Sequence, residues 1–166
     1  MMHPEIREFP VQRWSVTSSR PFDSVAEALA AAIGHPDLAA FTKDTAAAKT
    51  LDELETVIQK VLGQSGFMEF ARFDLGAILK KESGRGPRIY RFVIGNPLIM
   101  KEMVKHVPDA GSYAPVTILI DERPDGVHLS YDRMASFLGS YANPAALQVA
   151  RDLDSKVEAL LTGVAR

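Results

Sequence analysis

The fold of this 166-residue chain is decided by residues 88–134, which read RIYRFVIGNPLIMKEMVKHVPDAGSYAPVTILIDERPDGVHLSYDRM. Residues 88–94 and 116–121 are rich in β-branched and aromatic side chains, which favour β-strands. Residues 127–131 repeat this pattern directly after the Pro-Asp-Gly turn at 124–126. Two strands joined by a short turn form a hairpin, so the last two strands are expected to pair antiparallel.

A helix is expected between the first two of these strands. Asn96 is a favoured N-cap residue, and Pro97 suits the first helical position, where its missing N–H is not needed. Apolar residues then recur at helical spacing through residues 98–107. Residues 108–111, Pro-Asp-Ala-Gly, end the helix.

Elements on both sides of this stretch complete the pattern. The N-terminal side is expected to hold a strand at 11–18, a helix at 25–33, a short helix at 36–41, a helix from Thr50 to Leu62, a strand at 67–74, and a strand or short helix at 75–81. Asp23 or Ser24 is expected to cap the helix at 25–33, with Glu27 completing a capping box after Ser24. On the C-terminal side, a short helix at 134–138, which Asp132 and Arg133 would cap or pair with, precedes a long helix from Asn143 to Gly163.

This order predicts an α+β fold: a two-layer sandwich with a mostly antiparallel sheet and helices packed on one face. Residues 1–10 are polar and are expected to form an N-terminal tail, whereas residues 11–163 form a single domain. A domain of this length buries roughly 70% of the surface of its unfolded chain, so it can fold without a disulfide or a structural metal.

Composition excludes several classes of function. The chain has 19 Lys and Arg against 21 Asp and Glu, a net charge of −2 with no basic tail, so no nucleic-acid partner is expected. It has no cysteine, which rules out disulfides, thiolate nucleophiles and thiolate metal sites. The N-terminus does not resemble a secretory signal, and no apolar run approaches the ~20 residues that cross a bilayer. A cytoplasmic protein without membrane contact is therefore expected.

Residues 94–134 carry a resemblance to a known family. The Asn96-Pro97 helix start, the helix after it, and Pro115 just ahead of the next strand are similar to the family known as domain of unknown function 302. The resemblance extends over about residues 11–163, and it implies a compact two-layer domain, often paired as a dimer, with no established activity. Many members carry cysteine where this chain has Gly95 and Val116, so any thiol chemistry of those members does not carry over.

One face of the sheet is expected to gather polar side chains. Side chains alternate between the two faces of a strand, and the bulky apolar ones should face the helices. The other face would then receive Arg13, Ser15, Arg91, Thr117, His128 and Ser130. Guanidinium, imidazole and hydroxyl groups together suit a small anion. A helix N-terminus at Asn96 also favours anions. The predicted ligand-binding residues are Arg13, Arg91, Asn96, Thr117, His128 and Ser130.

Plainer interpretations stay open at each of these positions. The polar face could be solvated or could form a polar dimer interface, and Asn96 could simply cap its helix. A carboxylate between the two arginines would make a structural ion-pair network instead of a ligand site. Glu69 is the expected source of that carboxylate.

Three functions remain after these exclusions. The first is a small-molecule or anion-binding module. The second is an enzyme that uses His128 and Asp132, or Tyr113, as acid and base on the same face. The third is a homodimeric interaction domain without a ligand. No metal and no cofactor are expected, because the four histidines form neither HxH nor HExxH and no Gly-rich phosphate loop is present.

Overall fold

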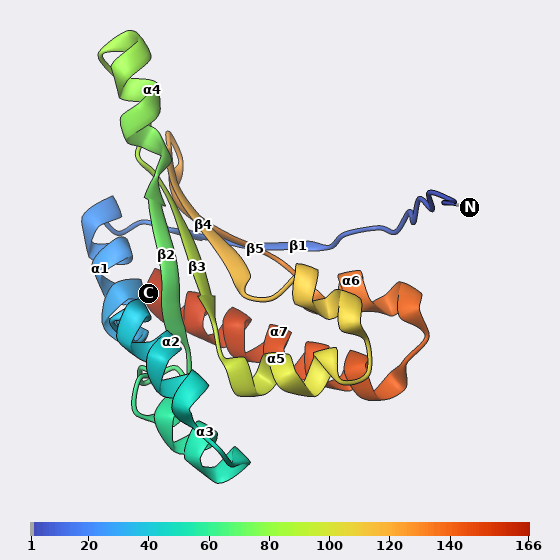
Figure 1. Cartoon of the computed structure of the whole chain (residues 1–166). Helices are drawn as coiled ribbons and strands as arrows, with labels where there is room; N and C mark the ends of the chain where they lie inside the picture. Colours follow the sequence, from blue (N-terminus) through green and yellow to red (C-terminus); the bar gives the residue numbers. More distant parts are fainter. Residues whose placement is uncertain (1) are drawn as a thin grey trace.

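A five-stranded antiparallel sheet forms one layer of the protein, as a computed structural model that describes residues 2–166 shows (Figure 1). The strands are β1 (Arg13–Ser18), β2 (Met68–Asp74), β3 (Ile89–Gly95), β4 (Val116–Arg123) and β5 (Gly126–Asp132). Their order across the sheet is β1-β5-β4-β3-β2, and every neighbouring pair is antiparallel. The predicted hairpin at 116–131 is the β4–β5 pair.

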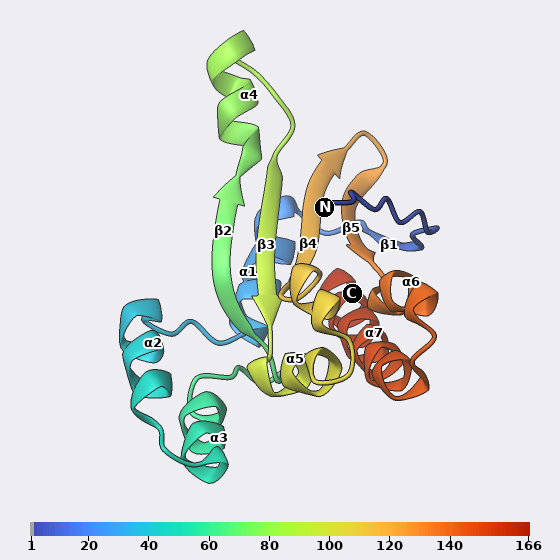
Figure 2. The ribbon, with the colours of Figure 1, turned by 45° about the vertical axis from the view of Figure 1, so that its right-hand side comes forward.

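Helices form the second layer. The helices are α1 (Phe22–Ala32), α2 (Leu38–Ala47), α3 (Leu51–Gln59), α4 (Leu75–Ser83), α5 (Pro97–Val104), α6 (Met134–Leu138) and α7 (Pro144–Ala165), with two 3-10 turns, η1 (Pro108–Ser112) and η2 (Gly139–Tyr141). Helices α1, α5 and α7 lie on the same face of the sheet, while α2 and α3 lie beside its β2 edge and α4 extends beyond the end of β2 (Figures 1 and 2). The prediction of an α+β fold is confirmed.

The core lies between the sheet and α1, α5, α6 and α7. It takes every second side chain of the central strands, among them Phe92, Ile118 and Leu129, which are fully buried. These positions are the apolar half of the alternation seen in the sequence. Within residues 2–166, no helix combines the length and the apolar character that crossing a bilayer requires.

Capping residues fix where most helices begin. Asn96 caps α5 by accepting a hydrogen bond from Leu98 N at 2.9 Å, and Asn143 caps α7 by accepting one from Ala146 N at 2.9 Å. Thr50 caps α3 through Glu53 N, as its capping box predicts. Asp74 caps α4, so the ambiguous residues 75–81 form a helix and not a strand.

Two helices start where the sequence analysis did not place them. Helix α1 begins at Phe22 and uses no side-chain cap, so the prediction of capping by Asp23 or Ser24 was wrong. Phe22 is buried and packs edge-on to Tyr90 at 5.0 Å, and this tertiary contact extends the helix towards its N-terminus. Helix α2 begins at Leu38, where Asp37 caps it through Ala40 N, and it runs on to Ala47 instead of ending near residue 41.

The start of α6 is also different from the prediction. Neither Asp132 nor Arg133 caps this helix. Asp154 of α7, which is fully buried, does so across the core by accepting hydrogen bonds from Met134 N at 2.7 Å and Ala135 N at 3.1 Å. Tyr131 donates its hydroxyl to the same carboxylate at 2.8 Å, and its burial beside this charge raises the pKa of Tyr131. A residue 20 positions away therefore does what adjacent residues were expected to do.

Candidate functional site

The face of the sheet opposite α1, α5 and α7 carries the polar side chains. The register pairs Arg13 with Asp132, Ser15 with Ser130 and Thr17 with His128 across β1 and β5. Paired positions lie on the same face of a sheet, and Ser130 pairs in turn with Leu119, which pairs with Arg91 on β3. The register thus places Arg13, Arg91 and His128 on one face, as the alternation predicts.

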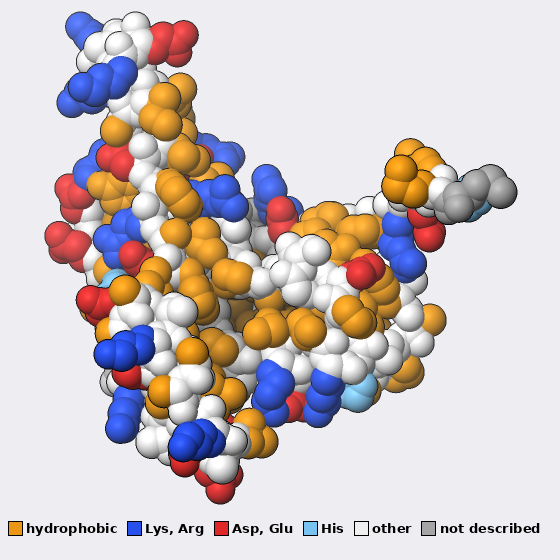
Figure 3. Space-filling model, in the orientation of Figure 1, with side chains coloured by type: hydrophobic (Ala, Val, Ile, Leu, Met, Phe, Trp, Pro, Cys, Tyr) orange, Lys and Arg blue, Asp and Glu red, His pale blue; other side chains and the backbone are white. Residues whose placement is uncertain are grey.

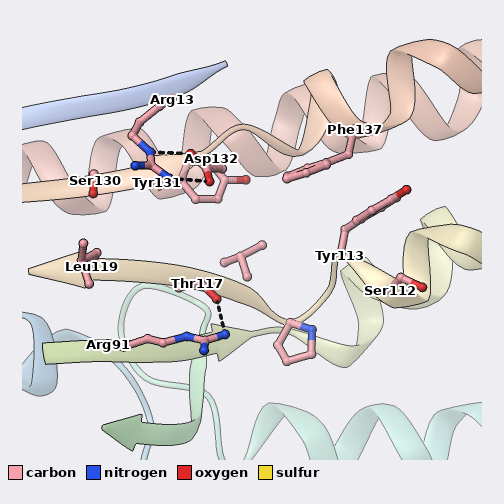
Figure 4. A pocket seen from close by; sticks show the side chains of 12 residues that line it. Arg13, Arg91, Ser112, Tyr113, Thr117, Leu119, Ser130, Tyr131, Asp132 and Phe137 are labelled. Carbon is pink, nitrogen blue, oxygen red and sulfur yellow. Dashed lines mark hydrogen bonds and ion pairs between the residues drawn. The ribbon is translucent and has the colours of Figure 1, made fainter. Parts of the chain in front are cut away.

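A cavity of about 380 Å³ opens on this face (Figure 4). Its lining combines strand residues with residues that follow η1 and lie in α6. The lining residues are Arg13, Arg91, Ser112, Tyr113, Pro115, Val116, Thr117, Leu119, Ser130, Tyr131, Asp132 and Phe137. Four of the six predicted ligand-binding residues, namely Arg13, Arg91, Thr117 and Ser130, therefore meet in one cavity.

The two arginines of the cavity have different partners. Arg13 forms a bidentate pair with Asp132, with Nε–Oδ1 2.7 Å and Nη2–Oδ2 2.9 Å, and these hydrogen bonds raise the pKa of Arg13. Arg91 donates only a long hydrogen bond, 3.4 Å, to the Thr117 hydroxyl, and its guanidinium lies 5.8 Å from the Phe73 ring. Within residues 2–166, no carboxylate lies at ion-pair distance from Arg91. Because Asp132 neutralises Arg13, the lining keeps one net positive charge, on Arg91.

Aromatic rings close one end of the cavity. Tyr113 and Phe137 stack with their centroids 4.7 Å apart, and Phe9 of the N-terminal segment packs edge-on against both rings, at 6.1 and 6.0 Å. The Tyr113 hydroxyl lies 2.8 Å from that of Tyr141. The sequence analysis considered Tyr113 only as an acid or base and did not identify Phe137. The sequence shows only that each of two segments carries an aromatic residue, and no local pattern reveals that these segments pack together.

His128 lies on the same face but does not line the cavity. Its Nε2 lies 2.8 Å from Asp125 Oδ1, and its Nδ1 lies 3.5 Å from the Thr17 hydroxyl. The hydrogen bond from His128 lowers the pKa of Asp125. Since Asp132 is held by Arg13, the structure does not pair His128 with Asp132 as acid and base.

Asn96 does not line this cavity either. Both ends of its side-chain amide are engaged: Oδ1 caps α5, and Nδ2 donates to Gly66 O at 3.0 Å. Asn96 instead lines a second cavity of about 230 Å³, which Gly95 and Val116 also line. Gly95 and Val116, where the family resemblance implies cysteine in many members, thus line one cavity.

Glu69 is not the carboxylate between the two arginines. It accepts hydrogen bonds from Arg72, the shorter at 2.7 Å, and lies 3.7 Å from His35. A register shift after Glu69 separates the first residues of β2 from the later ones, so the expected parity does not hold along the strand. Asp132 supplies the internal carboxylate, and it reaches only Arg13.

Metal ligands are sparse. Among residues 2–166, no three His, Asp or Glu side chains converge on a common point. The lining of the cavity offers the free guanidinium of Arg91, the Arg13–Asp132 ion pair, hydroxyls and aromatic faces.

Comparisons with known proteins support the fold. No curated protein matches the chain. Among solved structures, the chain is similar to the crystal structure of an uncharacterized conserved DUF302 protein from Bacillus stearothermophilus, with a TM-score of 0.64, 15% identity, and coverage of 93% of this chain and 98% of that chain. At this identity the likeness shows the fold alone. The profile of the family described as "Domain of unknown function DUF302" matches residues 41–164, three quarters of the sequence. The chain therefore belongs to the DUF302 family.

Proposed function

We propose that the protein binds a small organic anion in the cavity on the open face of its sheet. The observation that carries this proposal is Arg91, a guanidinium that lines a cavity without an acidic partner among residues 2–166. A guanidinium offers parallel N–H donors that match a carboxylate or a phosphate. The Thr117 hydroxyl beside it provides a further donor for the same anion.

The opposite wall supports an anion that carries a single charge. Arg13 and Asp132 neutralise each other there, so one net positive charge remains for the ligand. The oxygens of Asp132 also remain available to accept a hydrogen bond from a ligand hydroxyl or amino group, since a carboxylate has about four lone-pair sites. A volume of about 380 Å³ is near the lower end of known ligand sites, which favours a small molecule.

Thermal unfolding with a panel of anions tests the proposal. We expect at least one among phosphates, sulfate and small carboxylic acids to raise the melting temperature of the wild-type protein. Arg91→Gln should abolish this rise without lowering the melting temperature in the absence of anion. Arg151→Gln, which removes an exposed guanidinium from α7, is the matched control and should keep the rise. A melting temperature that no anion moves contradicts the proposal.

A homodimer is the second candidate, because the open face also presents apolar side chains. Ile89, Val93 and Leu119 are half-buried there, and Phe73 is 47% exposed. A two-fold dimer would bury the same patch on both copies, and a stable one buries more than about 1,000 Å². Light scattering at tens of micromolar should then report twice 18.2 kDa, and Phe73→Glu should return the monomer mass. The mass of a single chain contradicts this candidate.

No observation favours an enzyme with His128 and Asp132 as acid and base. His128 and Asp132 hydrogen-bond to different partners, and only Asp132 lines the cavity.

A further inference from the structure

The second cavity lies next to the first and has the opposite character. Its lining is apolar except for one amide, and the residues are Phe70, Gly95, Asn96, Pro97, Ile99, Met100, Met103, Gly111, Ala114, Pro115, Val116 and Leu153. Asn96 is the single polar side chain in this lining, and both of its polar atoms are already engaged, Oδ1 by Leu98 N and Nδ2 by Gly66 O. This cavity can therefore recognise only an apolar group.

The two cavities share a wall. Pro115 and Val116 line both of them. Thr117, which receives the hydrogen bond from Arg91, is two residues from Pro115, or about 7 Å along an extended strand. A molecule whose charged end lies on Arg91 therefore has the apolar cavity within reach.

A glycine of β3 lies at the shared wall and lines the apolar cavity. Gly95 follows Arg91 and Val93 at every second position of β3, so it belongs to the open face. A Cβ atom at Gly95 would lie 3.1 Å from Pro115 Cβ and 3.3 Å from a ring carbon of Phe70. The missing side chain thus lets Pro115 and Phe70 pack closely against β3, and a larger residue at position 95 would push them apart.

We infer that the ligand is an amphipathic monocarboxylate, with its carboxylate on Arg91 and its hydrocarbon chain in the apolar cavity beyond Pro115. The inference rests on the proposed function and names its ligand class. The apolar cavity alone, at about 230 Å³, is smaller than known ligand sites of about 300–1,000 Å³, whereas the two cavities together lie well inside that range. Figure 3 shows hydrophobic side chains gathered where β2 and β3 approach α5, the region of the apolar cavity.

Titration of the full chain with straight-chain monocarboxylates from acetate to decanoate, below their micelle concentrations, tests the inference. Each added methylene should tighten binding about fourfold until the apolar cavity is full, after which affinity should level off. Arg91→Gln should weaken every acid by a similar factor, about 10-fold or more, because the carboxylate contact is common to all. Primary alcohols of the same lengths lack the carboxylate. Their affinity for the wild-type protein should therefore be no higher than the affinity of the Arg91→Gln variant for the acids.

Filling the apolar cavity should affect only the longer acids. Gly111 lines this cavity, and a Cβ there makes only an ordinary contact, 3.9 Å from Val104 Cγ2, so Gly111→Leu should fold. In this variant the affinity should stop rising at a shorter chain length than in wild type, and the affinity for acetate should be unchanged. Gly139→Leu, in η2 where a Cβ meets no atom within 4 Å, is the matched control. Should Gly111→Leu fail to fold, Met100→Trp, at a half-buried lining residue, provides the same test.

Each outcome separates the two claims. Binding that requires Arg91 but does not vary with chain length overturns this inference and leaves the proposed function standing. Absence of binding by every acid overturns both. Alcohols that bind as tightly as acids, with the same length dependence in wild type and Arg91→Gln, would mean an independent apolar site and would also overturn the inference.

Discussion

The two faces of the sheet use the same alternation of side chains for opposite purposes. On β4, Ile118 and Ile120 lie under the helices and are completely buried, whereas Thr117 and Leu119 between them face the cavity. The helices decide the difference: α1, α5 and α7 cover one face, and within residues 2–166 no helix covers the other (Figure 2). Consecutive residues of one strand can therefore contribute alternately to the core and to a site on the open face.

Two aspartates show the same contrast. Asp154 is completely buried and accepts hydrogen bonds from Tyr131 and two backbone N–H groups, so it joins α7 to α6. Asp132 is half-exposed and holds only Arg13. Burial removes the competition from water, so we expect the first carboxylate to contribute to stability and the second to shape the cavity.

The largest expected effect is on the covered face. Ile118→Ala should lower the free energy of unfolding by about 2–5 kcal/mol, because it removes buried surface and leaves a cavity. Leu119→Ala, the adjacent residue on the open face, should cost clearly less. Urea unfolding of both variants measures the difference. Equal losses would mean that the open face is covered in solution, by a second copy for example.

The buried carboxylate comes next. Asp154→Asn removes the charge and one acceptor, so it should cost about 2–3 kcal/mol, in line with hydrogen bonds to charged groups. Asp132→Asn should cost less than about 1 kcal/mol, as exposed ion pairs do. Denaturant melts of the two variants, made side by side, test the contrast. Comparable losses would show that Asp132 carries more of the fold than its exposure indicates.

A smaller effect is expected at Asn96, where β3 passes into α5. Asn96→Ala should cost about 1 kcal/mol through the lost N-cap. Anion-dependent stabilisation should persist, since the side-chain polar atoms of Asn96 bind the backbone and not the cavity. Thermal melts with and without the best anion measure both effects. Loss of the anion effect would return Asn96 to the binding site that the sequence analysis proposed.

The smallest effect concerns pH on the open face. The hydrogen bond from His128 lowers the pKa of Asp125 below its ordinary value, so the native state favours the ionised carboxyl. Its contribution is therefore present above the ordinary pKa of about 4 and is lost as the pH falls through the lowered one. The stability difference between wild type and Asp125→Asn should shrink from pH 5 towards pH 2. A constant Asp125→Asn difference across this pH range would contradict the assignment.

The sequence by itself determined features that depend on neighbouring residues. The alternation of side chains along a strand is a local property. It therefore predicts that Arg13, Arg91, Thr117 and Ser130 lie on one face without knowledge of the fold. Asn96 and Thr50 cap their helices for the same reason, because a cap requires only a side chain two or three positions from the N–H that it accepts.

Only the tertiary structure decided which groups meet. The pairing of Arg13 with Asp132 joins residues 119 positions apart, and Asp154 caps a helix 20 positions away. The stacking of Tyr113 on Phe137 depends on how η1 and α6 pack at the end of the sheet. Such contacts follow from the order of strands and the lengths of connections, which no local pattern encodes. The sequence could therefore predict a polar face, and the packing of distant segments alone turned part of that face into a cavity with one uncompensated guanidinium.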